Sequence, residues 1–152
     1  MRNITISIND KKIHTEVPIS QTLLDFLRSN GITSVKRGCE SGECGACAVL
    51  VDDEPRASCI TLTLQADGKK VKTIEALSTR QDLSELQKRF IEVGAIQCGY
   101  CTPALILLAD HYLNTTVSHS EKELREAISG VLCRCTGYVK PVEAIKKEIK
   151  SD

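Results

Sequence analysis

Apolar residues follow two different spacings along this chain of 152 residues. In the first half they alternate with polar residues, which is the pattern of β-strands that bury one face. Asn9-Asp10 and Asp52-Asp53 interrupt the alternation and favour tight turns between paired strands. The pattern predicts strands at residues 3–8, 12–17 and 46–51, a return of the chain through residue 59, and a last strand at residues 71–74.

A short helix is expected between the two predicted hairpins. Pro18 ends the second strand, after which Ser20 or Thr22 can cap a helix with leucines on its buried side. Gly31 lies just past the expected end, where a residue in the left-handed conformation commonly terminates a helix. Two hairpins with one helix packed across a mixed sheet indicate a β-grasp fold.

Around residues 76–81 the spacing of apolar residues changes to that of amphipathic helices. The expected helices begin after a cap at Asp82, after a cap at Thr102 with Pro103 at the first helical position, after the capping box Ser120-x-x-Glu123, and at Pro141. We therefore predict an α+β protein, with a β-grasp domain at residues 1–77 and an all-α four-helix domain at residues 78–152.

Composition and charge narrow the function classes. Hydrophobic residues make up 41% of the chain and charged residues 26%, as in ordinary globular domains, and the net charge of zero gives no case for nucleic-acid binding. The longest apolar run, residues 104–109, is too short to cross a membrane, and the N-terminal residues do not resemble an export signal. We therefore expect a cytoplasmic protein that binds neither nucleic acid nor membrane.

Eight cysteines are the main candidates for chemistry. They fall into tight groups, which together with the missing export signal favours metal thiolates over disulfides. The first group, Cys39-x4-Cys44-x2-Cys47 followed by Cys59, has the ligand spacing of a plant-type 2Fe–2S cluster. Glycines at positions 38, 42 and 45 suit a loop that wraps closely around such a cluster, because glycine accepts positive φ.

A second group of cysteines lies in the helical half. It comprises Cys98, Cys101, Cys133 and Cys135, and its first pair comes just before the helix expected at residues 102–114. The positive N-terminal end of that helix would favour anionic thiolates. Spacing alone leaves zinc and iron–sulfur open, because four thiolates serve both.

Three stretches, in this order, carry a resemblance to a known family: GCESGECGAC at residues 38–47, IQCGYCTP at 96–103 and LCRCTGY at 132–138. Over roughly residues 3–145 the chain resembles the small iron–sulfur subunit of the molybdenum hydroxylases, the xanthine dehydrogenase and aldehyde oxidoreductase family. The resemblance implies a plant-type ferredoxin domain followed by a helical domain that carries a second 2Fe–2S cluster.

The same resemblance implies a role for each cysteine. The first cluster, on the flavin side, would be bound by Cys39, Cys44, Cys47 and Cys59. The second cluster, next to the molybdopterin, would be bound by Cys98, Cys101, Cys133 and Cys135. Gln97 matches a family residue that lies near the pterin, and Cys135 matches the ligand closest to it.

The function implied is electron transfer from a Mo-pterin centre, through the second cluster and then the first, to FAD. Molybdopterin and FAD would lie on partner subunits, a large molybdopterin-binding subunit and an FAD-binding subunit, with a dimer of heterotrimers as the expected assembly. No substrate chemistry is expected on this chain itself. The alternatives are a free-standing soluble ferredoxin and a ferredoxin domain fused to a structural zinc module.

Some positions depart from the usual residues of the resembled family. Ala48, Ala104 and Val131 do so, and the last two flank the second ligand set. We therefore expect them to affect the potential of the second cluster or its contact with the large subunit. Tyr100 and Arg134 lie between ligand cysteines and could either tune a cluster or contact a partner.

Overall fold

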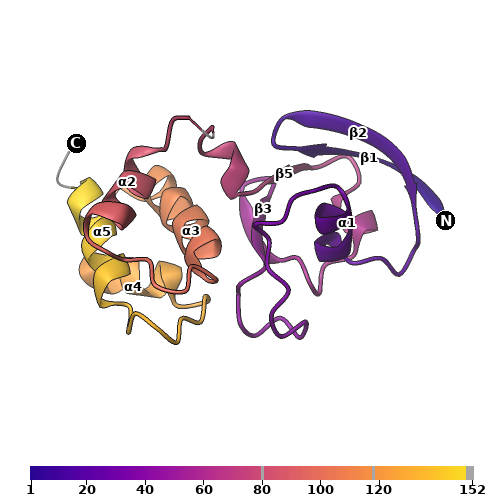
Figure 1. Ribbon diagram of the computed structural model, residues 1–152. Helices are drawn as coiled ribbons and strands as arrows, with labels where there is room; N and C mark the ends of the chain where they lie inside the picture. Colours follow the sequence, from indigo (N-terminus) through magenta and orange to yellow (C-terminus); the bar gives the residue numbers. More distant parts are fainter. Residues whose placement is uncertain (80, 118, 150–152) are drawn as a thin grey trace.

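The computed structural model describes residues 1–79, 81–117 and 119–149 of the chain. Two lobes lie side by side, a lobe built on a β-sheet, which holds the N-terminus, and a helical lobe formed by the second half of the chain (Figure 1). The α+β class and the order of the two parts are confirmed. Arg80, within the expected boundary, and residues 150–152, at the end of the expected second domain, lie outside the described residues.

The sheet is mixed and has the strand order β2-β1-β5-β3-β4. Its strands are β1 (Arg2–Ile8), β2 (Lys11–Val17), β3 (Ala48–Val51), β4 (Glu54–Ala57) and β5 (Lys70–Lys72). β1 pairs in parallel with β5, and the other neighbours are antiparallel. Both expected hairpin turns are confirmed, because Asn9, Asp10, Asp52 and Asp53 all have positive φ, as two-residue turns between twisted strands require.

The last strand ends two residues earlier than predicted. β5 stops at Lys72, and residues Ile74–Ala76 form a 3₁₀ helix, η2. The side chain of Asn9 explains the difference, because its Oδ1 accepts a hydrogen bond from the Thr73 amide at 2.9 Å and its Nδ2 donates to the Thr73 hydroxyl at 2.9 Å. These bonds engage the Thr73 amide with a side chain instead of a neighbouring strand, and the chain turns toward the helical lobe.

One helix covers the sheet, as predicted. α1 (Leu23–Ser29) is capped by Thr22, the second of the two candidate caps, whose hydroxyl accepts from the Asp25 amide at 3.1 Å. Its leucines and Phe26 are buried against apolar residues of β1 and β3. A 3₁₀ helix, η1 (Thr63–Ala66), completes this layer. Burial of that face accounts for the stability of so short a helix.

Four helices form the second lobe in the part of the chain that the structure describes, as predicted: α2 (Glu85–Glu92), α3 (Thr102–Thr115), α4 (Glu121–Ile128) and α5 (Val139–Ile149). The capping box of α4 is confirmed, with Ser120 as the cap and Glu123 as its partner. α3 is buried along residues 104–109, which fits the apolar run there and the central position of this helix (Figure 1). No helix in the described part of the chain combines the length and the apolar character needed to cross a bilayer.

The starts of three helices differ from the prediction. α2 is capped by Ser84, not Asp82, because Ser84 and Gln87 form a reciprocal capping box with bonds of 3.3 and 2.9 Å. α3 begins at Thr102 itself, so that Cys101 occupies the cap position. α5 begins at Val139, two residues before Pro141, since a proline is tolerated in the first turn, where amides have no helical partner.

The two lobes share part of their packing. Leu50 of β3 is buried in the same apolar cluster as the residues of α3, and Ala48 and Ile74 pack against that cluster. A salt bridge of 3.4 Å between Lys72 and Asp110 adds a polar contact between the sheet and α3. The core of the helical lobe therefore extends onto the sheet. The division at residue 77 stays a prediction.

Candidate iron–sulfur sites

The first cysteine loop is irregular and folds back on the sulfur of Cys39. Main-chain amides of Ser41, Glu43 and Cys44 donate to Cys39 Sγ at 3.4, 3.3 and 3.3 Å, and the Cys39 amide donates to Cys44 Sγ at 3.4 Å. The loop reaches this shape through positive φ at Glu40, Gly42 and Gly45. Several amides that converge on one sulfur form a cradle for a negatively charged thiolate.

The same contacts shift the acidity of the thiols. Hydrogen bonds from Ser41, followed by those from Cys44, lower the pKa of the exposed Cys39 thiol to about 6. Burial, together with contact with the Cys47 thiol, raises the pKa of Cys59 to about 11. One end of this group therefore favours the thiolate before any metal binds, and the other end favours the neutral thiol.

The β3–β4 hairpin brings the fourth cysteine to the loop. Ser58 follows β4, and its hydroxyl donates to the Cys47 carbonyl at 2.7 Å. This bond places Cys59 beside Cys47, and both side chains are buried. The structure thus brings together all four cysteines of the first predicted set, with Cys39 near Cys44 and Cys47 near Cys59.

The second set gathers from two loops that are distant in sequence. Cys98 and Cys101 precede α3, whereas Cys133 and Cys135 lie between α4 and α5. Burial, followed by contact with the Cys133 thiol, raises the pKa of Cys101 to about 12. Contact with the Cys98 thiol raises the pKa of Cys135. The four thiols therefore also lie two and two, Cys98 with Cys135 and Cys101 with Cys133.

Polar side chains support the loop of Cys133. Burial acts to raise the pKa of this thiol, but hydrogen bonds from Thr136, whose hydroxyl lies 3.0 Å from Cys133 Sγ, outweigh it, and the pKa is lowered. Tyr138 Oη accepts from the Cys133 amide at 2.8 Å and donates to the Val131 carbonyl at 3.0 Å. Tyr138 ends the stretch LCRCTGY, but nothing in the sequence alone predicted this role for it.

The two sets fit binuclear clusters better than single ions. Four cysteines are the usual ligands of a 2Fe–2S cluster, and two pairs of thiols match two iron atoms. Cys101 occupies the N-cap position of α3. The positive N-terminal end of this helix therefore lies beside the second cysteine set, as predicted.

The remaining residues of interest lie around these sets. Gln97 is exposed directly before Cys98, and Cys135 is exposed as well. Ala104 and Val131 are both buried in the core of the helical lobe. The histidines lie elsewhere: Nδ1 of His14 is 2.8 Å from the Thr5 hydroxyl, His111 lies within α3, and His119 stacks edge-on against Tyr112.

Comparison with known proteins gives the family. Residues 6–78 match the family described as "2Fe-2S iron-sulfur cluster binding domain", and residues 73–146 match "[2Fe-2S] binding domain". The chain is 43% identical to caffeine dehydrogenase subunit gamma of Pseudomonas sp. (strain CBB1), over 94% of this chain and 88% of that protein. It is 43% identical to the nicotinate dehydrogenase small FeS subunit of Eubacterium barkeri, over 99% and 98%.

Solved structures agree with this result. Quinoline 2-oxidoreductase from Pseudomonas putida 86 contains a chain with a TM-score of 0.90 and 41% identity, over 95% of this chain and 90% of that one. The aldehyde oxidoreductase from Desulfovibrio desulfuricans ATCC 27774 gives a TM-score of 0.91 at 36% identity, over 95% of this chain. This chain covers 16% of that longer chain, so there the same fold is one part of a larger polypeptide.

Fold, cysteine sets and relatives define an electron-transfer protein with two 2Fe–2S-binding domains. The chain belongs to the small iron–sulfur subunits of the molybdenum hydroxylases, the xanthine dehydrogenase family. It serves an oxidoreductase that has larger partner subunits. The match at residues 73–146 also decides the question that spacing left open, in favour of iron–sulfur and against zinc.

Proposed function

We propose that the eight cysteines are the cluster ligands, one set of four in each lobe. Cys39, Cys44, Cys47 and Cys59 bind the first 2Fe–2S cluster, and Cys98, Cys101, Cys133 and Cys135 bind the second. The observation that carries this assignment is the gathering of each set into two thiol pairs, from segments up to 37 residues apart in the second set (135 − 98). When bound, each cluster supplies a one-electron carrier, and the chain holds and tunes it.

The proposed direction of flow is from a Mo-pterin centre to the second cluster, then the first cluster, then FAD. Molybdopterin lies on a large partner subunit and FAD on another, and two such heterotrimers form a dimer. Gln97 and Cys135 face the pterin in this proposal. Their exposure supports it, because a group that contacts a partner's cofactor must be accessible on the isolated chain.

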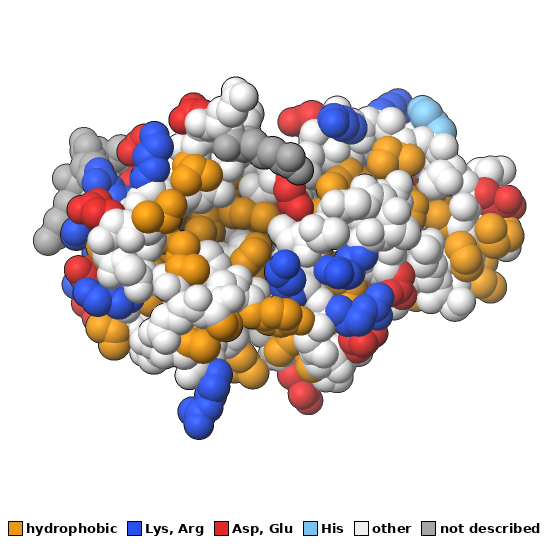
Figure 2. Space-filling model, viewed as in Figure 1, with side chains coloured by type: hydrophobic (Ala, Val, Ile, Leu, Met, Phe, Trp, Pro, Cys, Tyr) orange, Lys and Arg blue, Asp and Glu red, His pale blue; other side chains and the backbone are white. Residues whose placement is uncertain are grey.

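The surface around the second set supports docking of the large subunit there. Ile96, Tyr100 and Leu132 adjoin the cysteines of this set and are 41%, 45% and 61% exposed. Figure 2 shows hydrophobic side chains gathered around a hollow on one face of the helical lobe. Exposed apolar side chains beside a redox site mark a surface that a partner covers.

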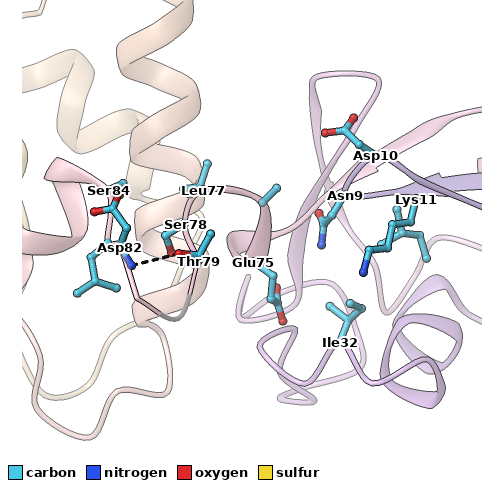
Figure 3. Close-up of a pocket in the computed structure, with 13 residues that line it drawn as sticks. Asn9, Asp10, Lys11, Ile32, Glu75, Leu77, Ser78, Thr79, Asp82 and Ser84 are labelled. Carbon is cyan, nitrogen blue, oxygen red and sulfur yellow. Dashed lines mark hydrogen bonds between the residues drawn. The ribbon is translucent and has the colours of Figure 1, made fainter.

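The cleft between the lobes, by contrast, offers no cysteine to a ligand. It has a volume of about 650 Å³, and Asn9, Lys11, Glu75 and Thr79 are among its lining residues (Figure 3). Since no cysteine lines this cleft, a molecule bound there would not touch either cluster.

Single substitutions test the ligand assignment. Cys59→Ser should remove the EPR signal of the first cluster and leave that of the second, and Cys101→Ser should do the reverse. Loss of both signals, or of neither, in both variants would contradict the assignment. Purification of a tagged chain from its source tests the partners. The molybdopterin subunit and the flavin subunit should co-purify, and recovery of the chain alone with full activity would refute the proposed assembly.

A further inference from the structure

The two cysteine loops contact each other through the main chain. The Leu132 amide donates to the Cys44 carbonyl at 2.9 Å. Beside this bond, a Cβ built on Gly45 would lie 1.9 Å from the Gly130 carbonyl oxygen, so only a glycine allows the two backbones to come so close. A residue of the first ligand set is thus joined by one hydrogen bond to the residue that directly precedes Cys133.

Tyr100 makes a second contact between the loops. It lies between Cys98 and Cys101, and its hydroxyl donates to the Arg37 carbonyl at 2.5 Å, two residues before Cys39. The Arg37 side chain pairs with Asp25 of α1 and, at 2.6 Å, with Glu40, so the segment that accepts this bond is itself anchored. Tyr100 is 45% exposed, so burial does not force its hydroxyl to find a partner within the protein.

These two hydrogen bonds join the two cysteine loops at two separate points. The bond from Leu132 to Cys44 offers a continuous route from Cys133 Sγ to Cys44 Sγ, through side-chain and main-chain bonds and one hydrogen bond. The bond from Tyr100 to Arg37 joins the two loops at a second point, between the Cys98–Cys101 segment and the residue two positions before Cys39, and restrains the loops from moving apart. The hydrogen bond from the Tyr100 hydroxyl to the Arg37 carbonyl therefore links the helical lobe to the sheet lobe, and we call this bond the clasp.

We propose that Tyr100 is a positioning residue for electron transfer between the two clusters. Its hydroxyl holds the loops together so that the hydrogen bond between Leu132 and Cys44 stays formed, and the electron crosses at that bond. The step oxidises the second cluster by one electron and reduces the first by one, with no proton transferred. The proposal rests on the ligand assignment of the proposed function.

The test compares Tyr100→Phe with the wild type in the iron-loaded complex. Tyr100→Phe keeps the ring and removes the clasp, and Tyr112→Phe, near the far end of α3, is the control for loss of a tyrosine hydroxyl in the same lobe. Hydrogen exchange of the Leu132 amide should become about fivefold faster in Tyr100→Phe, the factor that loss of one hydrogen bond gives. The rate of electron transfer between the clusters, followed after photochemical reduction, should fall, while both reduction potentials stay at the wild-type values.

Each result is decisive. Faster Leu132 exchange with slower transfer in Tyr100→Phe, and no change in Tyr112→Phe, supports the proposal. Unchanged exchange, or faster exchange with an unchanged transfer rate, overturns it, because Tyr100 would then be a structural contact at most. If Cys59→Ser and Cys101→Ser fail to remove separate EPR signals, the ligand assignment fails instead, and the exchange measurement still shows whether Tyr100 holds the loops together.

Discussion

The two cysteine sites are built in different ways. In the first, three of the four cysteines lie within residues 39–47, and amides of the same loop surround the sulfur of Cys39. In the second, the two pairs come from loops that are distant in sequence, one before α3 and one between α4 and α5, and Thr136 and Tyr138 support the latter. The first site therefore depends mainly on its loop, and the second on how the helices pack.

This difference predicts which disturbance of the fold would release each cluster. A loop closed by its own amides should retain its cluster when a distant core is disturbed. A site assembled between helices should lose its cluster when their packing loosens, because the two thiol pairs then separate. Cluster content and global stability should therefore be linked more tightly in the second site than in the first.

The largest effect is expected from the two phenylalanines of the chain. Phe90 is fully buried in the helical core, and Phe26 is 4% exposed in the core of the sheet lobe. Phe90→Ala should cost about 3–5 kcal/mol and remove the second EPR signal before the first. Phe26→Ala is the matched control, with a similar cost and the second signal retained. Thermal unfolding and EPR of both variants would contradict the comparison if the same signal were lost first in each.

Gly45→Ala should damage the first site and its contact with the second. The residue has φ of +66°, and an added Cβ would overlap the Gly130 carbonyl, so we expect a loss of about 3 kcal/mol or more together with the first cluster. Gly68→Ala separates the two causes, because Gly68 has φ of +75° with open space around it and should cost only about 1–2 kcal/mol. Equal losses of stability and iron in both variants would show that the close approach at Gly45 has no role.

Tyr138→Phe should weaken the second site alone. It leaves the Cys133 amide and the Val131 carbonyl without their partner, at a cost of about 1–3 kcal/mol. Iron release to a chelator, followed separately for the two EPR signals, should be faster for the second cluster only. Equal acceleration for both clusters would mean that Tyr138 supports the lobe as a whole.

The smallest effect concerns the cluster-free chain and its dependence on pH. The pKa of Cys39 is lowered to about 6 by its hydrogen bonds, so its thiolate stabilises the folded chain above the unfolded pKa of about 9, and this contribution is lost as the pH falls through about 6. Alkylation at pH 7 should modify Cys39 first, with a half-maximal rate near pH 6. Burial raises the pKa of Cys101 to about 12, which should leave it unmodified. A half-maximal rate near pH 9 at Cys39 would contradict the amide cradle.

Local patterns predicted most of the elements of this fold. Alternation and the Asn-Asp and Asp-Asp turns gave both hairpins, because two residues with positive φ must lie where such strands reverse. The errors lie at boundaries. Ser84, and not Asp82, caps α2 because Gln87 completes its capping box. The last strand ends early because Asn9 bonds to Thr73, which is 64 residues away in sequence.

For the sites too, local sequence patterns predicted some features, and contacts between distant segments determined the others. Cysteine spacing predicted the first set, since its ligands are neighbours in sequence, but left the metal of the second set open until the family was known. Contacts between the lobes could not be predicted, because Tyr100 and Arg37 are 63 residues apart and no periodicity connects them. The position of Gly45 against Gly130 likewise depends on how the two lobes pack against each other, which no local pattern predicts.

The central claim is that each lobe of this chain holds one 2Fe–2S cluster. The most direct test is the iron and acid-labile sulfide content of the anaerobically purified chain, with EPR after reduction by dithionite. We predict about four iron and four sulfide per chain and two distinct 2Fe–2S signals. About two of each with a single signal, and zinc in place of the missing iron, would contradict the account and break the electron route at its first step.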